Sequence, residues 1–126
     1  METNETDIEV GLLGSVFAAS MDCEGGSGYD RHLVNKCAAS GVTEEWFTRE
    51  STKKLWKAMT EAVKNDRALE PALLAHAMGE GGAAAVQAVV DGAPPTAAYA
   101  EWYLEAMRDR EVYRRFHKLC MKWLQG

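Results

Sequence analysis

The chain has 126 residues, of which 47% are hydrophobic and 26% are charged, and this composition is typical of one soluble globular domain. Its 14 basic and 19 acidic residues give a net charge of -5, which argues against a protein that binds nucleic acid through bulk positive charge. No apolar run approaches the ~18 residues of a transmembrane span, and the acidic N-terminus lacks the features of a signal peptide. We therefore expect a cytoplasmic protein with no membrane partner.

Apolar side chains recur every three or four residues along the chain, and this spacing predicts an all-α fold. In the first expected helix, Asp7 and Glu9 occupy the first turn, where the helix dipole favours acidic side chains. Thr48 is the expected N-cap of the third helix, and Pro71 fits the first turn of the fourth. The expected helices span residues 7–20, 30–39, about 49–65, 71–78, 83–90 and 97 to about 124.

Glycines, prolines and caps separate these helices. The glycine-rich segment 22–29 is an expected loop, and Thr43 begins a short capped turn that presents Trp46 and Phe47. The two prolines at 94–95 end the fifth helix, and Thr96 caps the last one. The pattern predicts a small helical head over residues 1–95, followed by one long helix over residues 96–126.

The last helix carries a seven-residue repeat of mostly large apolar side chains. It is too long for so small a domain, so its second half should project. We expect Tyr99 and Trp102 to pack on the head. The later aromatic side chains would expose a large apolar surface to water, so we expect either a downstream helix or a second copy of the chain to pack against them. The predicted self-association interface is Tyr99, Trp102, Tyr113, Phe116, Cys120 and Trp123.

A group of basic side chains on the same helix has two readings. One is a solvated helix face with pairs such as Glu111–Arg115, and the other is contact with nucleic-acid phosphates or an acidic partner. The residues for the second reading are Arg108, Arg110, Arg114, Arg115, Lys118 and Lys122.

Signatures of catalysis and of metal binding are missing from the sequence. It contains no P-loop, no GxSxG elbow and no HExxH helix. Cys23, Cys37 and Cys120 form no CxxC pair and predict free thiols. His117 and Cys120 lie three residues apart, but two ligands do not make a metal site. We expect no enzyme activity, cofactor or metal in this chain.

The order of several short motifs resembles a known family. The segment 8–17 is similar to its opening helix, and Phe47 followed by the basic segment 53–56 is similar to its aromatic turn and next helix. The segment 95–98, with Tyr103 and the arginines after it, is similar to the start of its later helix. Together these features, over about residues 7–116, resemble the N-terminal domain of DnaB-type replicative DNA helicases.

The chain departs from that family at four positions within the matching segments. Thr48 and Thr52 stand where the family usually has Tyr and His. Glu70 replaces an Asp, and Tyr99 replaces an Asn. The chain therefore resembles a divergent member.

The resemblance implies a non-catalytic collar domain that acts in DNA replication. Such domains have a helical head and a helical hairpin, pair through the hairpin, form a trimer of dimers on a hexameric ring and dock primase. The ATP- and Mg-dependent motor is a separate domain, absent here, so the expected chain is a fragment that ends after the first hairpin arm. DNA contact would be weak or indirect. The alternative is a free-standing helical protein that binds nucleic acid or regulates a helicase.

Overall fold

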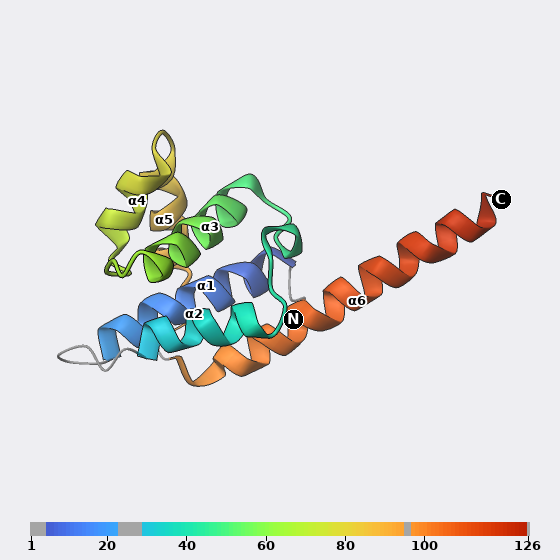
Figure 1. The fold of residues 1–126 in the computed structure, drawn as a ribbon, viewed down its shortest axis with the longest axis horizontal. Coiled ribbons are helices and arrows are strands. Elements are labelled where there is room, and N and C mark those ends of the chain that lie inside the picture. The colour runs from blue at the N-terminus through green and yellow to red at the C-terminus, as the bar shows by residue number, and fades with distance from the viewer. Residues whose placement is uncertain (1–4, 23–28, 95–96, 126) are drawn as a thin grey trace.

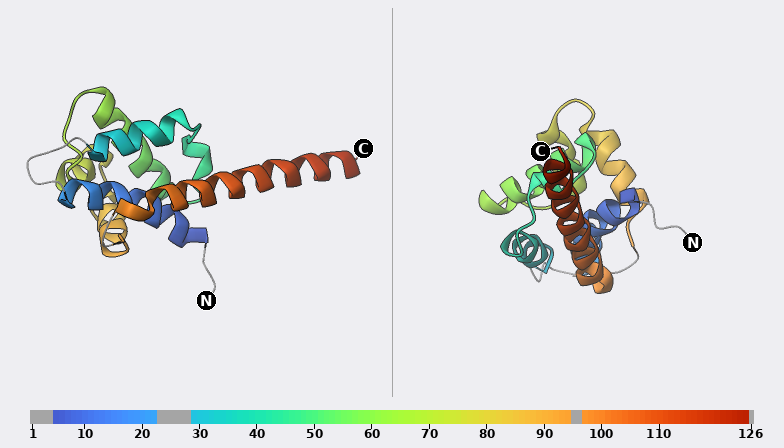
Figure 2. Two further views of the ribbon diagram at one scale, coloured as in Figure 1. Left: turned by 90° about the horizontal axis from the view of Figure 1, so that it is seen from below. Right: turned by 90° about the vertical axis from the view of Figure 1, so that its right-hand side faces the viewer.

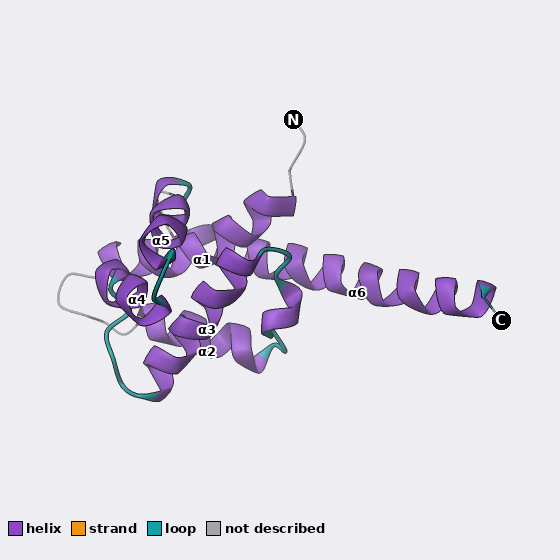
Figure 3. Cartoon of the chain, turned by 90° about the horizontal axis from the view of Figure 1, so that it is seen from above, coloured by secondary structure: helices purple, strands orange, loops and turns teal. Residues whose placement is uncertain are grey.

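The computed structural model describes residues 5–22, 29–94 and 97–125, and helices account for most of them (Figure 3). No strand occurs in these ranges, which confirms the all-α prediction. None of the helices described is long and apolar enough to cross a membrane. The helices are α1 (Glu5–Asp22), α2 (Tyr29–Ala39), α3 (Glu50–Lys64), α4 (Pro71–Met78), α5 (Gly82–Asp91) and α6 (Ala100–Leu124), with short 3-10 turns η1 (Glu44–Trp46) and η2 (Ala97–Tyr99).

The predicted helices are all present, but some of their ends differ. The N-cap of α3 is Arg49, so the prediction of Thr48 was wrong. Thr43 precedes η1 as predicted, but its side chain makes no capping hydrogen bond. The last helix begins at Ala100, after η2, and Thr96 lies outside the described residues. Most of the predicted loop at 22–29 also lies outside them.

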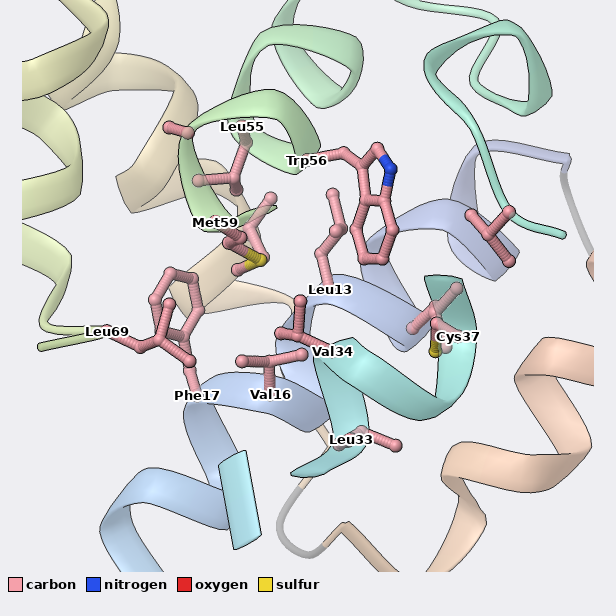
Figure 4. Packing of buried hydrophobic residues seen from close by; sticks show 14 of the residues in the cluster. Leu13, Val16, Phe17, Leu33, Val34, Cys37, Leu55, Trp56, Met59 and Leu69 are labelled. Atoms are coloured by element: carbon pink, nitrogen blue, oxygen red, sulfur yellow. The ribbon is translucent and has the colours of Figure 1, made fainter. Parts of the chain in front are cut away.

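The core forms where α1 lies between the other helices of the head. Leu13, Val16 and Phe17 of α1 face side chains from α2 and α3 (Figure 4). Trp46 and Phe47, which the sequence predicts to be presented by their turn, are buried instead. The ring of Phe47 stacks on Trp56 of α3 with centroids 5.8 Å apart, so the turn before α3 is part of the core.

The last helix has two parts. Its first half packs against α1, and its second half extends away from the head as a single rod (Figures 1 and 2). At 1.5 Å per residue, a helix of 25 residues is roughly 38 Å long. The prediction that the second half of this helix projects is confirmed.

Close contact between α1 and α6 depends on Gly11. A Cβ atom at this position would lie 2.2 Å from Cε1 of Tyr103, so the ring of Tyr103 occupies the space that any larger side chain needs. We expect Gly11→Ala to lower the free energy of unfolding by about 1–3 kcal/mol, because overpacking outweighs the helix propensity of alanine. Urea denaturation measures this change.

A double-mutant cycle separates the clash from other effects. In a Tyr103→Ala background the ring is gone, so Gly11→Ala should no longer destabilise the protein. An equal loss of stability in both backgrounds would show that the close approach to Tyr103 is not the cause.

Candidate functional site

The inner face of α6 fastens the helix to the head. Ala100, Leu104, Met107 and Glu111 are buried and recur at helical spacing, so they form one stripe that faces α1 and its neighbours. From Val112 to Gln125 every residue is exposed. Contact with the head therefore ends within one turn of Glu111.

The outward face of α6 carries the seven-residue repeat. Tyr113, Phe116 and Trp123 are 71%, 64% and 79% exposed, as expected for the projecting half. Tyr99 and Trp102 were predicted to pack on the head, but they are 60% and 55% exposed, so that prediction was wrong. The inner stripe, whose side chains are smaller than the aromatic ones, takes the position against the head, and this turns the aromatic repeat toward solvent. We call this surface the outward face: Tyr99, Trp102, Ala106, Asp109, Tyr113, Phe116, Cys120 and Trp123.

The predicted basic group divides into two sets. Arg110 turns toward the head, where its side chain is 9% exposed, and its Nη2 donates to the carbonyl oxygen of Trp46 at 2.6 Å. Arg114 donates to Glu111 at 3.1 Å and to the carbonyl oxygen of Glu45 at 3.3 Å. The arrangement contradicts the prediction of Arg110 as a surface contact, and it commits Arg114 partly to the head. The residues left exposed are Arg108, Arg115, Lys118 and Lys122.

The ion pair Glu111–Arg115, which was predicted for a solvent-exposed helix face, is present. Nε of Arg115 lies 3.5 Å from Oε1 of Glu111, and the Arg115 side chain is 72% exposed. Such an exposed pair contributes little to stability and leaves Arg115 available to another partner.

A buried carboxylate network joins the start of the chain to α6. Glu9, in α1, has no exposed side-chain area and accepts hydrogen bonds from Thr48 N at 3.0 Å, Thr48 Oγ1 at 2.5 Å and Thr52 Oγ1 at 2.7 Å. Nη1 of Arg110 lies 3.2 Å from its second oxygen. Burial alone would raise the pKa of Glu9, but the hydrogen bonds from Thr48 and Thr52 and the charge of Arg110 outweigh it, so the pKa lies below 4.5.

The sequence pattern placed Glu9 only in a favourable first turn and missed this network. One signal was present, because Glu9 shares a helix face with Leu12, Leu13 and Val16. Both threonines that depart from the helicase family pattern are donors to Glu9. Their small hydroxyl side chains satisfy a carboxylate that would otherwise be buried with fewer partners.

An apolar groove of about 450 Å³ lies between α3 and α4. Alanine and leucine side chains form most of its wall, and Leu73 is half-exposed at its edge. Its polar members Glu61, Arg67 and His76 are exposed and so keep their contact with water. The groove thus offers shape and apolar surface without a buried polar group to orient a ligand.

The thiols and histidines form no centre within the described part of the chain. Cys37 is buried, and this burial raises the pKa of its thiol to about 11, which makes it a poor nucleophile at neutral pH. Cys120 is exposed on the outward face. No three His, Cys, Asp or Glu side chains in the described ranges lie close enough to hold a metal ion. Cys23 falls outside these ranges.

No family model, curated protein or solved structure matches the chain. The similarity to replicative helicases therefore rests on the motifs alone and stays a prediction.

Proposed function

We propose that this chain is a non-catalytic association domain that pairs with a second copy through the outward face of α6. The observation that carries the proposal is the exposure of five aromatic side chains on one face of one helix. Aromatic side chains of this kind bury 150–250 Å² each, so pairing two such faces removes on the order of 1,000 Å² from water. That area is within the lower range of specific protein interfaces.

The resemblance extends this proposal to a biological setting. A small head followed by a long helix is the arrangement expected of the collar of a replicative DNA helicase. In that setting the pair is one of three dimers on a hexameric ring, the head docks primase in the cytoplasm, and a separate motor domain uses ATP and Mg. The outward face of α6 supports the pairing part of this function, and the motifs support the rest.

A dilution series tests the association. Sedimentation equilibrium from high to low micromolar concentration should show a dimer that dissociates on dilution, because interfaces at the lower end of the size range are weak. A monomer throughout the series would contradict the proposal.

The exposed cations favour a second candidate, a helical nucleic-acid-binding protein. Arg108, Arg115, Lys118 and Lys122 lie on the same helix and are open to phosphate groups. This function requires DNA binding that weakens steeply with salt, because each phosphate contact releases a counterion. A monomeric chain with such binding would favour this candidate over the association domain.

A further inference from the structure

The outward face of α6 is exposed over the full length of the helix, and this constrains how two copies can meet. Tyr99 and Trp102, beside the head, are more than half exposed, although less so than the aromatic side chains of the projecting half. Resting on the association proposed above, we infer that the two α6 helices pair antiparallel, with the heads at opposite ends. In this register Trp102 of one copy lies against Cys120 of its partner.

The seven-residue repeat sets large side chains against small ones at two of the four facing pairs in this register. In an antiparallel pair, side chains of the row Tyr99, Ala106, Tyr113 and Cys120 face the partner's row of Trp102, Asp109, Phe116 and Trp123. Phe116 then meets the partner's Ala106, and Trp102 meets the partner's Cys120, whereas Tyr99 meets the partner's Trp123 at each end of the pair. At the pairs with Ala106 and Cys120 the alternation of large and small side chains fills the space between the helices.

Asp109 distinguishes antiparallel from parallel pairing. It is the only charged member of the outward face and is exposed in the single chain. A parallel pair in register would place it opposite the partner's Asp109, so that two like charges would be brought together and desolvated. An antiparallel pair places it opposite the partner's Tyr113, whose hydroxyl group is able to donate a hydrogen bond to the carboxylate.

The position of the head leaves room for this arrangement. The head packs on the inner face of the first half of α6, and the second half stands clear of it (Figure 2). Two antiparallel helices joined by their outward faces thus carry their heads on opposite outer sides. Neither head lies between the helices.

Disulfide formation tests the orientation. In a Cys23→Ser background, Trp102→Cys places a thiol opposite the partner's Cys120, and oxidation should yield a covalent dimer. The matched control is Cys23→Ser alone, in which the two Cys120 thiols are roughly 27 Å apart in the antiparallel pair and should not react. Cys37 is buried and does not compete. Non-reducing electrophoresis reads the result.

The outcomes distinguish a failure of the proposed association from a failure of its antiparallel orientation. A monomer by sedimentation overturns the association itself. A dimer that oxidation links through Cys120 alone overturns only the antiparallel orientation. A dimer that oxidation links neither with nor without Trp102→Cys overturns the register, and a disulfide found only with Trp102→Cys supports it.

Discussion

Replacing Glu9 with alanine is expected to lower the free energy of unfolding by about 3–5 kcal/mol, the usual loss when one partner of a buried ion pair is removed. The change leaves Arg110, whose side chain is 9% exposed, without its carboxylate. It also removes the carboxylate to which the hydroxyl groups of Thr48 and Thr52 donate hydrogen bonds of 2.5 and 2.7 Å in the native chain. Urea denaturation followed by circular dichroism gives the value.

The matched control is Glu101→Ala, which removes an exposed carboxylate paired with Lys36. Little or no change in stability is expected there, because solvent screens an exposed pair. Equal losses in the free energy of unfolding for Glu9→Ala and Glu101→Ala would show that the buried Glu9 network contributes no more to stability than an exposed ion pair.

The pH dependence gives Glu9→Ala a second readout. The folded pKa of Glu9 lies below the ordinary value of 4.5, so its contribution to stability is complete above that value and is lost as the pH falls through the lowered folded pKa. The stability difference between the native chain and Glu9→Ala should therefore shrink in acid. A difference that stays constant from neutral pH to strongly acidic pH would contradict the assigned charge state.

Local spacing was sufficient to predict the helices of the head. Apolar stripes, a proline in a first turn and glycines at the ends are signals carried by neighbouring residues, and α4 begins and ends where they predict. The Glu9 network is different, because its partners lie 39, 43 and 101 residues away along the chain. Only the packed fold brings them together.

The two faces of α6 show a second limit of sequence patterns. The aromatic repeat and the stripe of Ala100, Leu104 and Met107 each have a spacing that suits a buried face. The larger side chains suggested contact with the head, but the smaller ones allow α6 to approach α1 closely, where Gly11 accommodates Tyr103. The fit of side chains between α1 and α6 determines which face of α6 turns inward. The spacing of apolar residues in the sequence carries no information about that fit.

The double substitution Phe116→Ala with Trp123→Ala is expected to weaken self-association by roughly a thousandfold. Both side chains are largely exposed in the single chain, so the loss falls on the dimer. In a symmetric pair each substitution acts twice, and buried aromatic side chains at an interface commonly cost 2 kcal/mol or more each when truncated to alanine, although such losses do not simply add. Sedimentation equilibrium over a dilution series measures the change.

The control for this variant is Lys118→Ala, on the same projecting half but away from the outward face, which should dimerise like the native chain. The head should keep its stability in both variants, since neither touches its core. An unchanged dimer with Phe116→Ala and Trp123→Ala would remove α6 as the interface.

Helix content links the dimer to the projecting half of α6. Beyond Glu111 every residue up to Gln125 is exposed, and the bond from Arg114 to the carbonyl oxygen of Glu45 is a surface contact, so in a monomer this half depends mainly on propagation from the first half and on its own weak propensity. Pairing adds packing to every turn. The double variant should therefore lose helical circular dichroism relative to the native dimer, because the unsupported end of α6 frays.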